Sequence, residues 1–317
     1  MIVTFTANPS LDRAVALLEP LRPGEVQTAG SVREDAGGKG INVTRVIRAA
    51  GADSLAVLPL DEGDPFGAVL RATHVPVVAV PVPGAARANI TLTDGDGVTT
   101  KVNLPGVPRT AADGAALIDA VVAASAAARW LVLAGSLPPG LPDSFYVDVI
   151  EAVRATPDAP RIAVDTSGAA LREVVAHGAP DLIKPNDEEL AELAGVTLDP
   201  DVPLAAAVAV VAAGLVPSRV GAAFVTLGGD GAVLVTADGA WQGTPPPTRV
   251  RSTVGAGDSS LAGFLLAESS GAEPGECLRN GIRYGSAAAS LPGTQAPGPA
   301  DLLPGDVPVR SIPRNEA

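Results

Sequence analysis

Cysteine, histidine and aromatic residues are scarce in this chain of 317 residues, and each scarcity excludes a class of protein. Cys277 is the only cysteine, so no disulfide can form within the chain and a reducing compartment is expected. His74 and His177 are the only histidines, which disfavours both a zinc site and a Ser-His-Asp hydrolase. Aromatic residues make up 3% of the chain, so its core must consist mainly of aliphatic side chains and alanine.

Positive charge is scarce as well. The chain has 22 Lys and Arg residues against 35 Asp and Glu residues, which gives a net charge of −13. An acidic protein gains nothing from the counterion release that drives binding to nucleic acids, so we expect no nucleic acid and no membrane as partner. The first residues, Met1–Phe5, lack the basic segment and the long apolar run of a signal peptide or a membrane span. The expected location is the cytoplasm.

The few lysines stand in conspicuous places. Lys39 lies in the run Gly-Gly-Lys-Gly and Lys184 in Lys-Pro-Asn, whereas every basic residue other than these two and Lys101 is an arginine. An acidic protein that binds an anion must build a local basic site against its own field. Lys39 and Lys184 are therefore candidates for anion binding.

Alternating strand and helix patterns predict the fold of the larger part of the chain. Short apolar runs alternate with segments of helical spacing, and the predicted strands include Trp130–Ala134, Ile162–Asp165, Leu182–Ile183 and Ala222–Leu227. Such alternation predicts an α/β fold with a doubly wound, mostly parallel sheet. Ligands of these sheets bind beyond the carboxyl ends of the strands. The tail from Pro297 is rich in Pro and Gly and is expected to be partly irregular.

A second, smaller sheet is predicted near the N-terminus. Asn89–Thr93 and Thr99–Asn103 flank two Asp-Gly pairs, which is typical of a β-hairpin. Further short strands are predicted at Ala14–Leu18 and Val26–Ser31. The hairpin strands are polar on one face, so they resemble a small sheet standing on a larger body rather than strands of its core.

The segment Ser252–Ser259 carries the strongest chemical signal. Its glycines precede an apolar helical run, and the N–H groups at such a helix start favour anions. A carboxylate would repel a phosphate there, but Asp258 fits a base that takes the proton of an attacking hydroxyl. The alternative interpretation is that Asp258 is an ordinary N-cap. The spacing matches neither a Walker A loop nor a Rossmann fingerprint.

Six segments in order resemble the PfkB family of ribokinase-like carbohydrate kinases over nearly the whole chain. They are Ala36–Val43, Gly135–Gly140, Asp165–Gly168, Lys184–Asn186 with Glu189, Thr226–Gly231 and Ser252–Ser259. The resemblance implies a Rossmann-like sheet with a small β-sheet lid in a single kinase domain. The lid would comprise residues 14–31 and 87–104, and the chain would form a homodimer through it.

The resemblance also implies roles for individual residues. Asp258 would be the catalytic base, and the amides of Gly255, Ala256 and Gly257 would stabilise the transferred phosphoryl group. The substrate would be bound by Asp12, Gly38, Lys39, Asn42, Arg87 and Ser136, with Lys39 and Arg87 holding its phosphate. The nucleotide would be bound by Lys184, Asn186, Thr226, Gly228, Gly231, Asn280 and Ser286.

The implied cofactors are ATP and Mg²⁺. Asn186 and Glu189 would position Mg²⁺ through water molecules, because Mg²⁺ keeps much of its hydration shell. The alternative interpretation of Glu189 is a first-turn carboxylate that is favoured by the helix dipole. Arg87 has an alternative interpretation too, as a charge that keeps an edge strand soluble. The sequence leaves a dependence on K⁺ open.

Within the family the chain is most similar to the 1-phosphofructokinase branch. Thr6–Asp12, Gly24–Val26, Lys39 and Asn103–Gly106 carry this similarity. It implies that ATP phosphorylates fructose 1-phosphate to fructose 1,6-bisphosphate. Tagatose-6-phosphate kinases and PfkB-type 6-phosphofructokinases share much of the pattern and remain alternatives. So does a kinase of ribose or a nucleoside, and so does a sugar-phosphate-binding regulator without turnover.

Overall fold

In residues 1–313, the part of the chain that the structure describes, ten strands form one large sheet. This computed structural model gives their order as β14-β13-β12-β11-β10-β9-β8-β1-β4-β5. The strands are β1 (Ile2–Phe5), β4 (Ser54–Leu60), β5 (Val77–Pro81), β8 (Trp130–Ala134), β9 (Arg161–Asp165), β10 (Leu182–Ile183), β11 (Ala222–Thr226), β12 (Ala232–Thr236), β13 (Ala240–Gly243) and β14 (Val309–Ile312). The strands from β5 to β11 are parallel and the last three are antiparallel, so the predicted doubly wound, mostly parallel sheet is confirmed.

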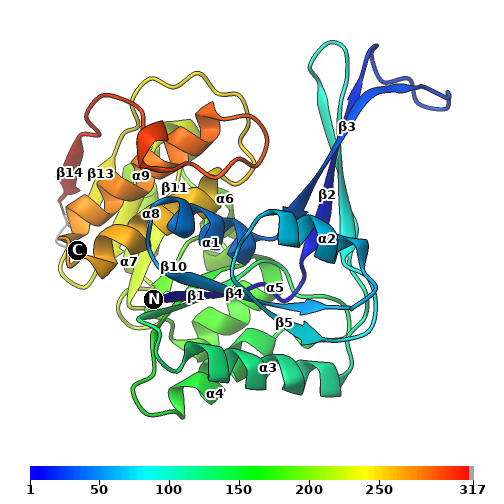
Figure 1. Cartoon of the computed structure of the whole chain (residues 1–317). Helices are drawn as coiled ribbons and strands as arrows, with labels where there is room; N and C mark the ends of the chain where they lie inside the picture. The colour runs from blue at the N-terminus through cyan, green and yellow to red at the C-terminus, as the bar shows by residue number, and fades with distance from the viewer. Residues whose placement is uncertain (314–317) are drawn as a thin grey trace.

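Helices cover both faces of the large sheet (Figure 1). They are α1 (Lys39–Ala49), α2 (Pro65–Ala72), α3 (Ala111–Ser125), α4 (Phe145–Arg154), α5 (Gly168–Glu173), α6 (Asp187–Ala194), α7 (Leu204–Ala213), α8 (Ala256–Ser269) and α9 (Pro274–Ser290). Helices α1, α8 and α9 pack together on one face, and α3 and α4 lie on the other. In the described residues no helix is both long and apolar enough to cross a bilayer.

The few aromatic side chains are concentrated in the core. Phe224 on β11 and Phe264 on α8 stack with their ring centroids 5.1 Å apart. On the opposite face, Phe5 meets the ring of Tyr146 edge-on at 6.3 Å. All of these rings are buried, and each contributes roughly 1.5–3 kcal/mol relative to an exposed ring. The core is expected from the composition to be mainly aliphatic, and on each face of the large sheet it also contains an aromatic contact.

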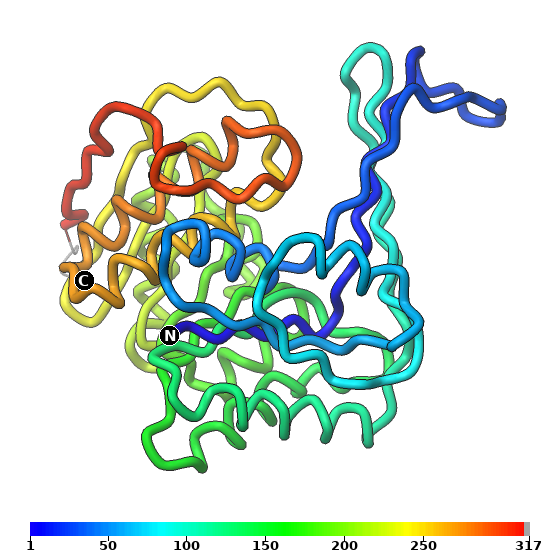
Figure 2. The backbone as a smooth tube through the Cα atoms, viewed as in Figure 1, coloured from blue at the N-terminus to red at the C-terminus, as the bar shows by residue number. Residues whose placement is uncertain are grey.

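The small sheet projects from the large body as a long, narrow ribbon (Figures 1 and 2). Its strand order is β3-β2-β6-β7, with β2 at Ser10–Leu17, β3 at Ala29–Gly37, β6 at Arg87–Thr93 and β7 at Thr99–Asn103. The predicted hairpin is confirmed as β6 and β7. The predicted N-terminal pair was placed wrongly, because β2 begins at Ser10 and β3 extends to Gly37. The charged run Arg33-Glu34-Asp35 has low strand propensity, and pairing with β2 overrides it.

The C-terminal tail is more regular than its Pro and Gly content predicted. Val309–Ile312 pairs antiparallel with β13 and forms the edge of the large sheet. Strand β13 was not predicted either, because it has only four residues, the last of them is Gly243, and Gly239 directly precedes it. Strand β14 depends on a partner far away in sequence, which local patterns do not reveal, whereas β13 pairs with the preceding strand β12 as well as with β14.

The carboxyl ends of the central strands meet the starts of two helices. Strands β9, β10 and β11 end at Asp165, Ile183 and Thr226, and α1 and α8 begin at the same edge. Strand β1 leads at this edge into the small sheet through Thr6–Pro9. The candidate site therefore lies where the large sheet, two helix starts and the small sheet meet.

Candidate active site

Asp258 lies in the first turn of α8, where the helix start faces a cavity. The N-cap is Gly255, with a φ of 77° that favours glycine, and Asp258 is the third residue of the helix. Its side chain is 7% exposed and makes no capping bond, so its interpretation as an ordinary N-cap is wrong. The first N–H groups of a helix have no intrahelical partner. The amides around Gly257 are therefore available to an anion beside the carboxylate.

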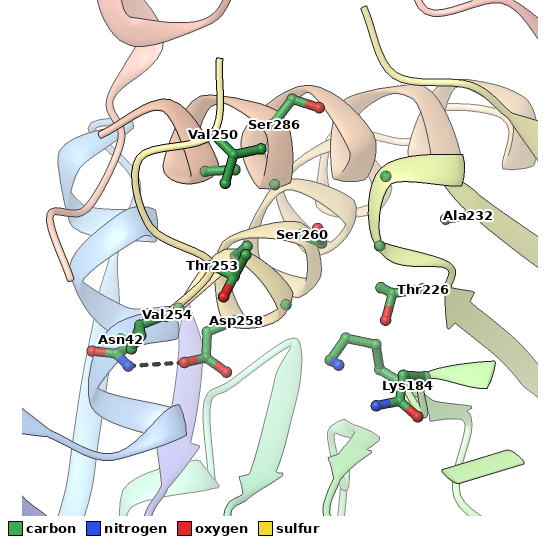
Figure 3. A pocket seen from close by; sticks show the side chains of 18 of the residues that line it. Asn42, Lys184, Thr226, Ala232, Val250, Thr253, Val254, Asp258, Ser260 and Ser286 are labelled. Carbon is green, nitrogen blue, oxygen red and sulfur yellow. Dashed lines mark hydrogen bonds between the residues drawn. The ribbon is translucent and has the colours of Figure 1, made fainter. Parts of the chain in front are cut away.

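Asn42 holds the Asp258 carboxylate from the facing helix α1. The amide Nδ2 of Asn42 donates to Oδ2 of Asp258 at 2.8 Å (Figure 3). The other amide atom of Asn42, Oδ1, is buried and has no hydrogen-bond partner. Both residues line the cavity, so an orphaned acceptor stands next to the candidate base. A substrate hydroxyl between the two could donate to either oxygen.

A buried carboxylate bridges two lysines on the floor of the site. Asp165, at the end of β9, is fully buried and accepts from Nζ of Lys39 at 2.6 Å. Its second oxygen lies 3.2 Å from Nζ of Lys184, which directly follows β10. Burial would raise the pKa of Asp165, but the two ammonium groups hold it below its usual value. Two cations share one buried anion here, and the carboxylate of Asp258 also lies in the field of both lysines.

Lys39 is fixed as a cation at this point. Burial by itself would lower its pKa, but the carboxylates of Asp165 and Asp258 outweigh that effect and raise it. The backbone before it is unusual, because Gly38 has a φ of 135° and a Cβ there would lie 2.8 Å from the Thr6 side chain. The glycine allows α1 to start close to β1, with Lys39 directed at Asp165.

Burial raises the pKa of Asp258 to about 6, and the nearby Asp165 carboxylate adds to the effect. Lys39, Asn42 and Lys184 act in the opposite direction. A carboxyl group with this pKa is ionised at neutral pH but still binds a proton readily, which suits a general base. Its position and its acidity thus agree with the predicted role.

The Asn42 hydrogen bond should be visible in the pH profile. We expect kcat/KM to rise with pH through an inflection near 6, as Asp258 loses its proton. The Asn42→Ala variant removes a bond that favours the carboxylate form, so the inflection should move to higher pH. A pH profile of both proteins checks this. An unchanged inflection in Asn42→Ala would show that the bond does not tune Asp258.

Asn186 and Glu189 form a reciprocal capping box at the start of α6. The backbone N–H of Glu189 donates to Oδ1 of Asn186 at 2.7 Å, and the N–H of Asn186 donates to Oε2 of Glu189 at 2.9 Å. The interpretation of Glu189 as a first-turn carboxylate is thus confirmed. Its Oε1 keeps no hydrogen-bond partner among the described residues, and both side chains line the cavity. The pair can therefore cap α6 and at the same time contact a ligand in the cavity.

A polar group on the small sheet lines the other end of the cavity. Oδ1 of Asp12 accepts from Ser10 at 2.7 Å and from Asn89 at 2.9 Å. Beside it, Arg87 donates through NH1 to the Leu104 carbonyl at 3.0 Å, while its Nε is buried without a partner. Burial lowers the pKa of Arg87 and raises that of Asp12. Arg87 lies on an inner strand, so its interpretation as an edge-strand charge is wrong.

One cavity of about 900 Å³ joins all of these groups. It runs from the small sheet past Asp258 and the lysines to Thr226 and Gly228, and then to an apolar end at Val250 and Ser286 (Figure 3). The predicted residues that line it are Asp12, Gly38, Lys39, Asn42, Arg87, Lys184, Asn186, Glu189, Thr226, Gly228, Gly231, Gly255, Ala256, Gly257, Asp258 and Ser286.

Two predicted residues do not line this cavity. Ser136 is exposed and lies 3.4 Å from Nδ2 of Asn8, next to the small-sheet end. Asn280 donates through Nδ2 to the Gly263 carbonyl at 2.6 Å and thereby joins α9 to α8. That contact joins two helices, so the prediction that Asn280 binds the nucleotide is not supported by its position.

The model of the pfkB family of carbohydrate kinases matches residues 6–301. The chain belongs to this family. It is therefore a phosphotransferase, and the PfkB resemblance of its motifs is confirmed. The matched residues include every helix, strand and loop that lines the cavity.

Curated relatives of this kinase act on hexose phosphates. It is 33% identical to the 1-phosphofructokinase of Rhodobacter capsulatus, over 98% of both chains. It is 34% identical to the ATP-dependent 6-phosphofructokinase isozyme 2 of Escherichia coli, over 93% of this chain and 94% of that one. The crystal structure of phosphofructokinase-2 from E. coli in complex with potassium superposes with a TM-score of 0.86 at 30% identity and covers 95% of this kinase and 96% of that chain.

Three functional candidates in this kinase were not assigned from sequence. Asp165 was noted only as part of a motif, although it is the group that joins Lys39 and Lys184. Ser10 and Asn89 were not singled out, although both bind Asp12. A carboxylate at the end of a buried strand was the available signal for Asp165, because such strand ends meet at one edge of the sheet.

Proposed function

We propose that this kinase transfers the γ-phosphoryl group of ATP to the 6-hydroxyl of fructose 1-phosphate. The observation that carries the proposal is the single cavity that holds Asp258 and two lysines at its centre and Arg87 at its small-sheet end. A neutral sugar would leave the buried Nε of Arg87 without a hydrogen-bond partner, whereas the phosphate of a sugar phosphate would supply one. We place the reaction in the cytoplasm, which suits the single unpaired cysteine.

Each step of the transfer has a group in position. Asp258 takes the proton of the attacking hydroxyl as the new oxygen–phosphorus bond forms and the bond to ADP breaks. We assign the amides of Gly255, Ala256 and Gly257, at the start of α8, to the charge that develops on the transferred group. The Ala256 amide donates to the Thr253 carbonyl at 3.4 Å and would have to exchange this long hydrogen bond for the phosphoryl group. Closure of the small sheet over the cavity would exclude water, which otherwise competes as acceptor.

Lys39 and Arg87 take different roles in this mechanism. Lys39 contacts Asp165 and lies in the field of Asp258 and Glu189, so we assign it to the phosphoryl group in transfer. Arg87 is left to hold the phosphate that the substrate already carries, as a planar fork with its free Nε. This changes the expectation that both residues bind the same phosphate.

The donor set fits a Mg²⁺ ion at the nucleotide phosphates. Oxygen ligands suit Mg²⁺, and Glu189 offers Oε1 while the amide of Asn186 lies beside it. In the described residues no group of three or more His, Cys, Asp or Glu side chains is gathered for direct ligation, which agrees with contacts through water. When bound, the ion would neutralise phosphate charge, and Lys184 would contribute to the same end.

The acceptor is tested by a panel of sugars with Mg-ATP. We expect the highest kcat/KM with fructose 1-phosphate, and low values with fructose 6-phosphate, tagatose 6-phosphate and neutral fructose or ribose. Preference for a 6-phosphate would keep the mechanism and move the acceptor to C1, whereas turnover of neutral sugars alone would contradict the role of Arg87. Exchanging K⁺ for Na⁺ in the same assay settles the dependence that the sequence left open.

The exposed apolar residues of the small sheet support a homodimer through this lid. Val26 and Val32 lie on its β3 side, Val98 and Val102 on its β7 side, and all are exposed. We expect light scattering to give twice the chain mass of 31.5 kDa, and Val32→Glu to reduce it. Val210→Glu on α7, also an exposed valine, is the control that should leave the mass unchanged. A monomeric wild type would contradict the dimer.

A further inference from the structure

The connection between β5 and β6 leads directly to Arg87 and contains neither helix nor strand. It runs from Val82 to Ala86 and joins the edge of the large sheet to the small sheet. Arg87 is the first residue of β6, where the ladder with β2 begins. The ladder with β7 begins two residues later, at Asn89. The backbone position of Arg87 therefore depends on β2 and on the connection that precedes it.

Two carboxylates from the loop before α2 accept hydrogen bonds from this connection. Oδ2 of Asp61 accepts from the amide of Gly84 at 2.9 Å. Oδ2 of Asp64 accepts from the amide of Ala86 at 2.6 Å. The second bond is the closer one along the chain to the phosphate-binding side chain, because Ala86 directly precedes Arg87.

Asp64 also caps helix α2. Its other oxygen, Oδ1, accepts from the amide of Phe66 at 2.9 Å, which is an N-cap bond. The helix is anchored by the buried side chains of Phe66 and Leu70, and it packs against β3 at the base of the ribbon (Figure 1). One carboxylate thus joins a fixed helix to the residue before Arg87, with a separate oxygen for each.

The side chain of Arg87 has few contacts of its own that could fix its direction. NH1 donates to the Leu104 carbonyl, and the buried Nε has no partner. The carboxylate that raises the pKa of Arg87 against the effect of burial is that of Asp12. The direction of the guanidinium into the cavity therefore depends strongly on where its backbone is held.

From these contacts we infer that Asp64 is a positioning residue for the substrate phosphate. Its hydrogen bond to the Ala86 amide holds the start of β6 so that the guanidinium of Arg87 reaches the phosphate in the cavity. The inference rests on the proposed function, because it takes Arg87 as the group that binds this phosphate. The competing interpretation is that Asp64 only caps α2.

The Asp64→Ser variant separates the two contacts of the carboxylate. Serine is a good N-cap, so the bond to the Phe66 amide can remain, but its single oxygen cannot also reach the Ala86 amide. We expect KM for fructose 1-phosphate to rise about 3- to 10-fold, the effect of one hydrogen bond, with kcat and KM for ATP unchanged. Loss of a negative charge alone would favour an anionic substrate and lower KM. An unchanged or lower KM would overturn the inference.

A double variant tests whether Asp64 acts through Arg87. In the Arg87→Met background, Asp64→Ser should change KM by less than about twofold, because the side chain that it positions is already gone. A further rise as large as that in the wild-type background would overturn the inference. If Arg87→Met alone left KM unchanged, the proposed function would lose its phosphate-binding group. A raised KM in Arg87→Met with an unchanged KM in Asp64→Ser would contradict the positioning role alone.

Asp199→Ser is the matched control. Oδ1 of Asp199 accepts from the Asp201 amide at 2.9 Å in the connection between α6 and α7, away from the cavity lining. Its loss removes the same kind of bond and the same charge, and it should leave KM unchanged. Melting curves show whether each variant folds. If Asp64→Ser does not fold, Asp64→Asn replaces it, since asparagine also caps a helix and its NH₂ group cannot accept from the Ala86 amide.

Discussion

The Asp258→Asn variant should lose about 10²- to 10⁴-fold in kcat while it still binds nucleotide. General base catalysis contributes about 10²–10⁴-fold, and an amide cannot take the hydroxyl proton. The carboxylate is buried beside two lysines and has a pKa of about 6, so its loss removes the proton acceptor from the centre of the cavity. Steady-state kinetics together with calorimetric titration of ADP check both parts.

Asp119→Asn is the matched control for this prediction, because Asp119 is exposed on α3 and away from the cavity. It should keep the full kcat. An Asp258→Asn protein with a native melting curve and most of its activity would rule out Asp258 as the base. A variant that fails to bind ADP would report damage to the fold rather than to the chemistry, which the melting curve identifies.

The Arg87→Met variant should raise KM for the sugar phosphate by about 10- to 100-fold. A hydrogen bond to a charged group is worth about 1.5–3 kcal/mol, and about 1.4 kcal/mol corresponds to tenfold. Methionine keeps much of the volume but removes the charge, and Nε of Arg87 is buried with no other partner. Turnover at saturation should change much less, since this group lies at the small-sheet end of the cavity and Asp258 at its centre.

Arg13→Met serves as its control in the same small sheet. Arg13 pairs with Glu34 at 2.7 Å and is 48% exposed, so its loss should leave KM unchanged. An exposed pair of this kind contributes little to stability as well. An equal KM for wild type and Arg87→Met would show that the substrate phosphate is bound elsewhere.

The alternation of the central elements could be read from the sequence because their signals are local. Trp130–Ala134 and Leu182–Ile183 were predicted with their observed bounds. Each is an apolar run with turn residues or proline at its ends. Two of the strands that were missed or displaced are edge strands: β14 has a partner distant in sequence, and β3 carries charged side chains. The third, β13, is a strand of only four residues between β12 and β14.

The sequence predicted which residues belong to the candidate site better than it predicted which of them contact one another. Asp258 and Asn42 were named separately, but no local pattern shows that they share a hydrogen bond across 216 positions of the chain. Lys39 was assigned to the substrate phosphate on the strength of the family resemblance, whereas its partner in the structure is Asp165, 126 positions away. Such pairs depend on which strand ends meet, and that follows from the strand order of the whole sheet.

The most direct measurement is a rapid-quench single turnover with γ-labelled ATP, Mg²⁺ and fructose 1-phosphate. We expect the label to appear in fructose 1,6-bisphosphate at C6, with little inorganic phosphate, because Asp258 activates the sugar hydroxyl and the closed cavity excludes water. Label that appears only as inorganic phosphate, or that stays in ATP in the presence of every sugar phosphate, would contradict the proposed transfer.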